Sequence, residues 1–569
     1  MSNIQQANVR PPVPAAAISS APSAKGAAGS LSFSATRALD AAAWAILLAV
    51  VLIAYLTFDD YGLGWDDYTH SQYGQLLLDY YASGLTDTRA LSFVNLYMYG
   101  GGFDMLAALI AKLLPYDLFE TRRLVGAAVG IIGLFVIWRL ARRIGGPVAG
   151  LIALALLATT PLYYGHIFIN AKDAPFAVAM AVLLFGLVRL LEDYPKPRPV
   201  TVLIFALGLG LTLGTRIMGG MAALYMVLPM ALLIVHDMRA DGAKPAAVNF
   251  GAFLLRLLPG FLLAYAVMAV IWPWCIREPL NPIRAVGYFS HFFEKPWKEM
   301  FDGQLISVPD MPRSYLPTLF GLKLTEILLL LGIPGLIAGI GLSVRHDIPV
   351  RRRATMVLLA GAFAIPIGIT IITRPALYNG IRHFIFVLPP LTVLGGLAGA
   401  WLLHWLAERS RLATAVAAVV MVAGFAVPAV DMVGLHPYQY THYNRVSGGM
   451  RGANHHYMLD YWGLSFKEAA DQLLTVLEEK GIATPEGRRW VIAVCGPHPP
   501  AEAELGSDFV ITWNTKGADF ALMLGEFYCA ELNAPELVKI ERDGVVFARV
   551  YDIRGRNIPS LFTEPPITH

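Results

Sequence analysis

The chain has 569 residues, of which 56% are hydrophobic and only 15% are charged. Soluble proteins average about 45–50% apolar and about 25% charged residues, so this composition, with a mean hydropathy of +0.55, indicates a membrane protein. The formal net charge of +3 is too small to indicate a nucleic-acid partner, and three cysteines are too few for a disulfide framework.

Residues 1–37 are predicted to form a disordered cytoplasmic tail, because they are rich in Ala, Ser and Pro and lack hydrophobic periodicity. A membrane span requires roughly 20 helical residues, and eleven apolar runs of about that length follow within residues 38–431. The runs cover approximately residues 40–58, 122–141, 147–166, 174–192, 199–216, 217–236, 252–274, 324–343, 354–373, 384–407 and 412–431. The predicted fold class is therefore a mainly α, polytopic membrane protein with about eleven transmembrane helices.

The orientation follows from the Lys and Arg residues in the connecting loops, because positive residues near a span resist translocation. One set of loops carries fifteen of them, whereas the short loops of the other set carry four, and the long loop 276–323 adds six. We therefore expect a cytoplasmic N-terminus. Three large segments then lie on the periplasmic face: residues 59–121, residues 276–323 and the C-terminal residues 432–569.

The C-terminal residues 432–569 are polar and mixed in charge, which predicts a separate water-soluble periplasmic α/β domain. A helix is expected at residues 465–480, with Ser465 and Glu468 as a capping box. Strands are expected at residues 490–495, 508–513, 519–524 and 544–551. Cys495 and Cys529 can pair in an oxidising periplasm, or they can remain buried free thiols.

The first polar segment follows the first span and contains the adjacent carboxylates Asp66 and Asp67, with His70 one turn further on. Carboxylates at a membrane surface are costly unless they are partnered, and a metal ion or a hydroxyl substrate would supply the partner. The structural alternative is that Asp66 caps a helix that starts near Tyr68. Both interpretations stay open.

The second polar segment is a short outer turn that crowds four polar side chains together: His166, Asn170, Lys172 and Asp173. Lys172 suits a phosphate, and Asp173 suits a metal ion or a sugar hydroxyl. The structural alternative is that Asp173 caps the following helix, with Pro175 in its first turn.

Further candidates lie at the outer ends of spans and in the segment before the C-terminal domain. Arg216 and Arg382, the latter followed by His383, are costly near the apolar zone unless they meet an anion such as a lipid phosphate, although each can also snorkel to headgroups. The segment 438–463 is rich in aromatic residues and glycine and contains Tyr443, Asn444 and Asp460. It suits a platform for a sugar or an acceptor, or a membrane-interface belt.

Over roughly residues 40–465 the chain resembles the GT-C superfamily of integral-membrane glycosyltransferases, in the branch of protein O-mannosyltransferases and lipid A aminoarabinose transferases. The resemblance rests on the acidic pair Asp66-Asp67, where the family usually has Asp-Glu, and on the N-x-K-D-x-P-F stretch at residues 170–176. No Walker loop, Rossmann glycine pattern or H-E-x-x-H motif is present in the sequence.

The resemblance implies an inverting transfer of a sugar from a polyprenyl-phosphate donor to a hydroxyl of a lipid, glycan or protein on the periplasmic face. It implies Asp66 as the general base, with Asp67 in an auxiliary role, and preorganised cations for the leaving phosphate. The expected phosphate ligands are Lys172, Arg216, Arg382 and His383. The expected substrate ligands are His70, His166, Asn170, Tyr443, Asn444 and Asp460. Asp173 is a candidate ligand for a divalent metal such as Mg or Mn.

Two other functions remain open from the sequence. A transporter or lipid flippase is suggested by the span count alone, but transporters generally carry ionisable residues near mid-membrane, where these spans have almost none. A non-catalytic scaffold that binds glycans through its outer domain would give no product with any donor.

Overall fold

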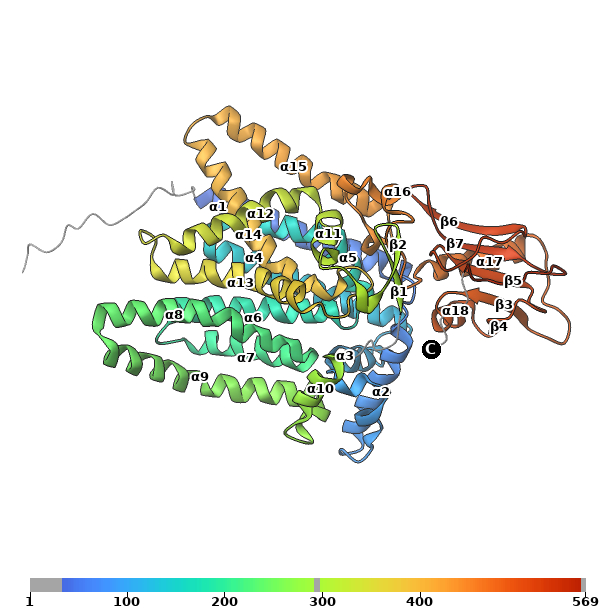
Figure 1. Ribbon diagram of the computed structural model, residues 1–569, viewed down its shortest axis with the longest axis horizontal. Helices are drawn as coiled ribbons and strands as arrows, with labels where there is room; N and C mark the ends of the chain where they lie inside the picture. Colours follow the sequence, from blue (N-terminus) through green and yellow to red (C-terminus); the bar gives the residue numbers. More distant parts are fainter. Residues whose placement is uncertain (1–32, 291–296, 564–569) are drawn as a thin grey trace, which may run out of the picture.

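The computed structural model describes residues 33–290 and 297–563. Residues 1–32 of the predicted disordered tail therefore lie outside the described residues, and residues 33–37 already belong to the first helix. The helices run side by side along the long axis of the molecule, and the strands of the C-terminal sheet gather at one end (Figure 1). The architecture confirms the predicted class of a mainly α, multi-pass membrane protein with a C-terminal sheet domain.

Within the described residues, nine helices are long and apolar enough to cross a membrane. The long apolar helices, together with the shorter helix α7, are α1 (Phe33–Thr57), α4 (Leu118–Ala158), α6 (Asp173–Asp193), α7 (Pro199–Thr215), α8 (Ala222–Asp241), α9 (Ala243–Ile271), α12 (Glu326–Val344), α13 (Val350–Thr373), α14 (Leu388–Ala407) and α15 (Arg411–Gly434). They coincide with the predicted apolar runs, because sustained hydrophobicity over about 20 residues is the strongest signal in such a sequence.

Helix α4 contains two of the predicted spans. Its 41 residues include Gly146 with a φ of 84°, a conformation that glycine adopts readily. A β-carbon on Gly150 would lie only 3.1 Å from a ring carbon of Trp138, although twelve residues of straight helix would separate the two by about 18 Å. The chain therefore folds back at Gly146, and α5 (Pro161–Ile169) continues the returning segment.

The outer segment 59–121 is folded into short helices at the end of the bundle nearest the sheet (Figure 1). These are α2 (Asp67–Ala82) and α3 (Gly102–Ala111), with 3₁₀ helices η1 (Phe58–Asp60), η2 (Thr88–Ser92) and η3 (Leu96–Met98). The segment approaches α7 so closely that a β-carbon on Gly100 would overlap the carbonyl oxygen of Gly214. Only glycine permits this contact between two backbones.

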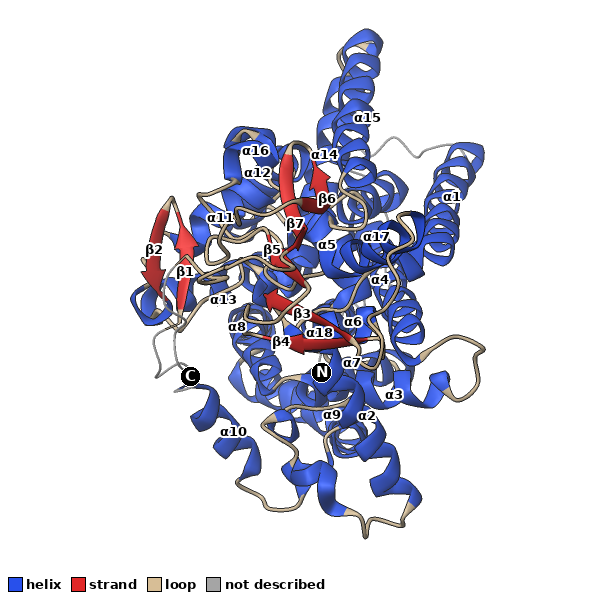
Figure 2. Cartoon of the chain, turned by 90° about the vertical axis from the view of Figure 1, so that its right-hand side faces the viewer, coloured by secondary structure: helices blue, strands red, loops and turns tan. Residues whose placement is uncertain are grey.

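The second outer segment, residues 276–323, and the segment after the last span cover the same end of the bundle. The former contains α10 (Asn281–Ser290), the hairpin β1 (Lys298–Phe301) and β2 (Gln304–Ser307), and α11 (Tyr315–Lys323). The remaining short helices are η4 (Ile217–Met221), η5 (Pro273–Ile276), η6 (Val308–Asp310), η7 (Arg382–Val387), η8 (Gln439–Thr441), η9 (Arg445–Ser447) and α16 (Gly449–Ala453). Figure 2 shows the hairpin beside the main sheet and separate from it. The amide of Gly303 donates to the carbonyl of His456, which fastens the hairpin to the segment before the sheet domain.

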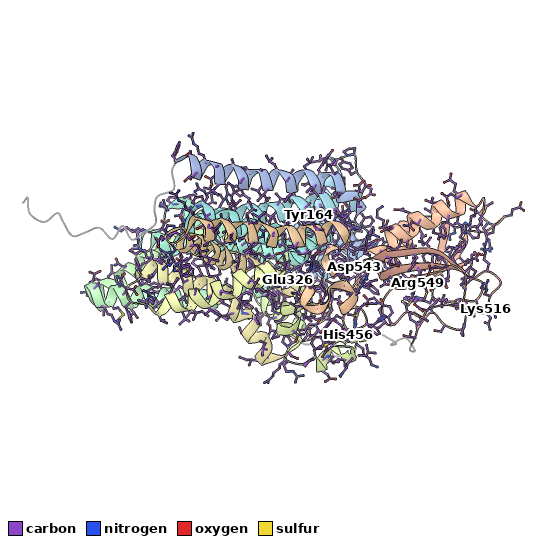
Figure 3. The ribbon with its side chains drawn as sticks, turned by 90° about the horizontal axis from the view of Figure 1, so that it is seen from above. Tyr164, Glu326, His456, Lys516, Asp543 and Arg549 are labelled. Carbon is purple, nitrogen blue, oxygen red and sulfur yellow. A yellow bond between two sulfur atoms is a disulfide. The ribbon has the colours of Figure 1, made fainter. Side chains whose placement is uncertain are left out.

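The C-terminal domain is built on a five-stranded sheet of order β4-β3-β5-β7-β6. Its elements are α17 (Ser465–Glu479), β3 (Trp490–Cys495), α18 (His498–Leu505), β4 (Phe509–Thr512), β5 (Phe520–Leu524), β6 (Glu536–Arg542) and β7 (Val545–Asp552). Strand β3 pairs in parallel with β4 and β5, and β7 pairs antiparallel with β5 and β6. The labelled residues in Figure 3 separate the two parts: Tyr164 and Glu326 lie in the bundle, and Lys516 and Arg549 lie in the sheet domain.

Three predictions for this domain have different outcomes. The four predicted strands and the helix are present, and Cys495 and Cys529 form a disulfide. The predicted capping box is wrong: the Ser465 hydroxyl donates to the carbonyl of Phe547, and Glu468 accepts from Tyr438 and pairs with Arg542. Strand β6 was not predicted, because the charged residues at its ends obscure the alternation of buried and exposed side chains, in which Val538 and Ile540 are the buried ones.

Candidate active site

Asp66 lies at the N-terminus of α2, and its side chain does not cap the helix. Helix α2 begins at Asp67, yet the structure shows no hydrogen bond from the Asp66 carboxylate to the first turn. The structural alternative, a capping Asp66, is therefore wrong. The half-buried Asp66 carboxylate instead interacts electrostatically with Lys172, Arg382, His70 and Asp173. Segments that lie about a hundred to three hundred residues apart in the chain therefore meet around Asp66.

Asp173, the first residue of α6, lies at the centre of these interactions. Its carboxylate pairs with Arg216 at the end of α7 and with Arg382 Nη1 at 3.1 Å, and it accepts from Asn170 Nδ2 at 2.9 Å. We call Asp66, Lys172, Asp173, Arg216 and Arg382 the Asp173 cluster. Three cations face two carboxylates in it, so the cluster retains one positive charge that an anion can neutralise.

Aromatic rings line the cations of the Asp173 cluster. The Lys172 ammonium lies 4.5 Å from the ring centroid of Tyr99, and the Arg216 guanidinium lies 5.6 Å from the same ring. The Arg382 guanidinium lies 5.0 Å from the ring centroid of Tyr378 and 5.2 Å from that of Trp462. These contacts fix the directions of the cations without using up their hydrogen-bond donors.

The electrostatics keep Asp66 ionised. Burial alone raises the pKa of its carboxyl, but Lys172 and Arg382 outweigh burial and hold the pKa below its usual value. Burial lowers the pKa of Lys172, which Asp66 in part offsets. At neutral pH the site therefore presents a carboxylate without a hydrogen-bond partner among the described residues, facing a cation-rich surface.

Asp67, which was predicted to be catalytic, belongs to a different cluster from Asp66. Its carboxylate, 4% exposed, accepts from the amide of Gly64 at 2.9 Å and pairs with Arg123 Nη2 at 3.1 Å and Arg122 Nε at 3.7 Å. Arg123 also donates to the carbonyl of Tyr61 at 2.9 Å. Asp67 therefore fastens the start of α2 to α4 through its ion pairs with both arginines.

His70 is held by the same network. Its Nδ1 lies 2.7 Å from Asp104 Oδ2, and Arg122 Nη2 donates to Asp104 Oδ1 at 2.8 Å. The ring is 3% exposed, and its Nε2 has no hydrogen-bond partner among the described residues. Asp67, His70, Asp104, Arg122 and Arg123 form what we call the Asp67 cluster, in which two carboxylates meet two guanidinium groups.

Two further predicted substrate ligands have structural roles instead. The buried Asp460 carboxylate accepts from the amides of Leu464 at 3.0 Å and Ser465 at 3.1 Å and from the Tyr440 hydroxyl, so it fixes the start of α17. Asn444 donates to the carbonyls of Gly321 and Leu324 and accepts from two following amides. Asn444 thereby uses all the hydrogen-bonding directions of its amide, and Asp460 accepts three of the about four bonds that a carboxylate can accept.

Three of the remaining predicted residues lie close to the Asp173 cluster: His166, Asn170 and His383. His166 is fully buried; its Nε2 lies 3.1 Å from the Tyr461 hydroxyl, and its Nδ1 lies 3.3 Å from Asn170 Nδ2. Asn170 therefore holds the Asp173 carboxylate, and His166 in turn holds the side chain of Asn170. The half-buried His383 ring lies 4.9 Å from that of Tyr378. Tyr443 lies under the ammonium of Lys323, away from the cluster's ion pairs.

The predicted metal does not fit Asp173. Guanidinium groups engage both of its oxygens, and a third bond comes from Asn170. No group of three or more His, Cys, Asp or Glu residues that could hold a metal ion occurs in the described ranges 33–290 and 297–563. We therefore derive no reaction step through a metal.

Several residues of the site were not predicted. Tyr99, Asp104, Tyr378 and the arginine pair Arg122-Arg123 carry no motif. One signal was available for the arginines. Two adjacent cations at the predicted outer end of a span depart from the preference of positive residues for the cytoplasmic side, which indicates that carboxylates pair with them. The sequence gives no means of identifying those partners.

Comparison with known proteins gives one match at the level of sequence families. Residues 102–274 match the model of the family described as dolichyl-phosphate-mannose-protein mannosyltransferase. No curated protein matches the chain. The matched segment contains Asp104, Arg122, Lys172, Asp173 and Arg216.

Solved structures show distant likenesses. The crystal structure of ArnT from Cupriavidus metallidurans bound to undecaprenyl phosphate is 17% identical, with a TM-score of 0.47 over 89% of this chain and 97% of that chain. The oligosaccharyltransferase AglB from Archaeoglobus fulgidus, in complex with an inhibitory peptide and a dolichol-phosphate, is 12% identical, with a TM-score of 0.44 over 91% and 75% of the chains. The family match confirms the resemblance to membrane glycosyltransferases, over the segment that supplies Lys172, Asp173 and Arg216.

Proposed function

We propose that the protein is a glycosyltransferase that moves a sugar from a polyprenyl-phosphate donor to a hydroxyl acceptor at the periplasmic face of a bacterial inner membrane. The observation that carries the proposal is the position of Asp66, an ionised carboxylate without a hydrogen-bond partner among the described residues, beside the cations of the Asp173 cluster. The family match over residues 102–274 supports the reaction class.

The reaction requires a base for the acceptor and an electrostatic partner for the leaving group. Asp66 takes the proton of the acceptor hydroxyl while that oxygen attacks the anomeric carbon from the face opposite the phosphate, which inverts the configuration. A carboxylate with a lowered pKa is a weak base, so the proton moves late, when the attacking oxygen has become acidic. Positioning supplies much of the acceleration.

Departure of the polyprenyl phosphate is assisted by the cations. As the sugar–phosphate bond breaks, negative charge grows on the phosphate, and Lys172, Arg216 and Arg382 stabilise it. Asp173 holds the two arginines in place before the donor binds, so little reorganisation is needed during the reaction. Its role is positioning.

The location of the site is supported by the disulfide. Cys495 and Cys529 are bonded in the sheet domain, and structural disulfides persist mainly in oxidising compartments such as the periplasm. The Asp173 cluster includes Trp462, just before that domain, among its aromatic neighbours. The active site therefore belongs to the same side of the membrane as the disulfide.

The test uses the full chain in lipid nanodiscs, with release of polyprenyl phosphate from a polyprenyl-phosphate sugar as the readout. Asp66→Asn removes the base and is expected to lower kcat by about 10²–10⁴-fold with an unchanged thermal midpoint. Asp59→Asn is the matched control, because it makes the same chemical change at an exposed position seven residues earlier. Near-native turnover of Asp66→Asn would remove Asp66 from the mechanism. Movement of the lipid across a bilayer without a covalent product would favour a transporter instead.

A further inference from the structure

A second group of buried polar side chains lies outside the Asp173 cluster, where four segments of the chain meet. Glu299 comes from the hairpin strand β1, Lys323 from the end of α11, Tyr443 from the segment after the last span, and Glu526 from the loop after β5. All four are buried, with exposed fractions between 1% and 7%. With Tyr315, they form what we call the Lys323 cluster.

Lys323 carries an ammonium group that the surrounding protein leaves unsatisfied. The residue is 1% exposed, and its Nζ has no hydrogen-bond partner among the described residues. It lies 4.0 Å from the ring centroid of Tyr443, an interaction that uses none of its three donors directionally. Burial lowers the pKa of Lys323 to about 7. Such a group is costly in a folded chain unless a ligand completes it.

The two carboxylates near Lys323 are oriented but incompletely used. Glu299 accepts from the Tyr315 hydroxyl at 2.6 Å and from the amides of Asn379 at 2.6 Å and Gly380 at 3.4 Å, and Glu526 accepts from the amide of Leu459 at 2.9 Å. Both interact electrostatically with Lys323, but neither forms an ion pair with it within 4.0 Å in the described part of the chain. A carboxylate accepts about four hydrogen bonds, so directions remain for another donor.

A chain of contacts connects the Lys323 cluster to the Asp173 cluster. Tyr461 lies in electrostatic range of both Glu299 and Arg382. Its hydroxyl reaches His166, which contacts Asn170, and Asn170 donates to Asp173. Glu299 also interacts electrostatically with Arg382. The two clusters are therefore neighbouring parts of one polar region at the outer end of the bundle.

We propose that the Lys323 cluster binds hydroxyl groups of a neutral sugar ring, carried either by the donor lipid or by the acceptor. The inference rests on the proposed glycosyltransferase function and deepens it. A hydroxyl both accepts and donates, so vicinal hydroxyls accept from the Lys323 ammonium while they donate to Glu299 and Glu526. The stacked rings of Tyr443 and Tyr457, with centroids 5.4 Å apart, supply an aromatic flank.

The small charge of the cluster argues for a neutral sugar, because burial lowers the pKa of Lys323 to about 7 and raises that of Glu299 to about 7 and that of Glu526 to about 8. Burial of a charged amino sugar or uronic acid beside these groups is costly, whereas neutral hydroxyls form hydrogen bonds with the amine and with both carboxyl groups. The cluster is therefore a specificity device for the sugar, separate from the cations that hold the phosphate.

The test compares the native chain with Lys323→Met, using Lys112→Met at an exposed outer position as the matched control. The probes are undecaprenyl phosphate, undecaprenyl-phosphate mannose and octyl α-mannoside, and the readout is the shift of the thermal midpoint with probe concentration. Without a probe, Lys323→Met is expected to be at least as stable as the native chain, because methionine removes an unsatisfied buried charge. A lysine needed only for structure would lower the midpoint when it is replaced.

With probes, Lys323→Met is expected to bind undecaprenyl phosphate as the native chain does and to bind one mannose-bearing probe at least tenfold more weakly. Weaker binding of undecaprenyl-phosphate mannose places the donor sugar in the cluster, and weaker binding of octyl α-mannoside places the acceptor there. Native affinity of Lys323→Met for both overturns the proposal, as does tighter binding of an aminoarabinose or galacturonate donor than of the mannose donor by the native chain. A native chain that does not bind undecaprenyl phosphate at all would instead contradict the proposed function.

Discussion

Asp66 and Asp67 are neighbours in the chain but belong to clusters with different balances of charge. In the Asp67 cluster two carboxylates meet two guanidinium groups, and all four charged side chains are paired and buried. In the Asp173 cluster three cations meet two carboxylates, and the half-buried Asp66 has no hydrogen-bond partner within the described ranges. The first arrangement holds the outer segment against α4. The second leaves a positive charge and a free carboxylate for a substrate.

The Asp67→Asn variant gives the strongest test of the difference between the Asp67 cluster and the Asp173 cluster. The change leaves Arg122 and Arg123 buried with a weakened partner, and breaking a buried ion pair typically costs about 3–5 kcal/mol. We therefore expect a large fall in the thermal midpoint, with residual transfer in the fraction that remains folded. The matched variant is Asp66→Asn, which should show the reverse pattern. Equal stability of the two variants would contradict the assignment of Asp67 to a structural cluster.

Arg382→Lys probes the phosphate side of the Asp173 cluster. Lysine keeps the charge but loses the planar guanidinium, which here meets Asp173 while it lies near the rings of Tyr378 and Trp462. We expect kcat to fall by about 10–100-fold, equivalent to about 1.4–2.7 kcal/mol, with little change in stability. Arg374→Lys, at an exposed outer position, serves as the control. Unchanged kcat would exclude Arg382 from stabilising the leaving phosphate.

The smallest expected effect is a displacement of the pH profile. Activity requires ionised Asp66, whose pKa is lowered, so no loss is expected on the acid side until the pH falls below about 4. Activity also requires protonated Lys172, whose pKa burial lowers, so the alkaline loss begins below the ordinary lysine value of 10.5. Lys172→Arg should move the alkaline limb to higher pH, whereas Lys112→Arg should leave it in place. An alkaline limb that does not move would assign it to another group.

The spans and the broad position of the site were predictable, because both depend on local sequence. Long apolar runs identify helices, and the residues at their outer ends identify the polar region that contains Lys172, Asp173, Arg216 and Arg382. The roles within that region were less accessible. Asp67, Asn444 and Asp460 are residue types that often bind ligands, yet other groups of the protein engage them. Nearby backbone amides donate to Asp67 and Asp460, arginines of α4 pair with Asp67, and the carbonyl of Gly321 accepts from Asn444.

The same limit explains what the sequence did not reveal. Lys323, Glu299 and Glu526 lie in three different segments, and nothing in their local sequence marks them as buried. Only the packing of the hairpin and the sheet domain onto the bundle brings them together. An unpaired buried charge is a property of tertiary structure, so its detection requires coordinates.

The close approach of Gly100 to Gly214 restricts how a long isoprenoid tail can reach the proposed site. At that level the outer segment and the end of α7 are in backbone contact, so no side chain there can rotate aside to open a path. Arg216 follows Gly214 by two residues, directly after the last residue of α7. A bulkier residue at Gly100 would meet the backbone of Gly214 and Thr215, so it would shift the end of α7 rather than widen an entrance.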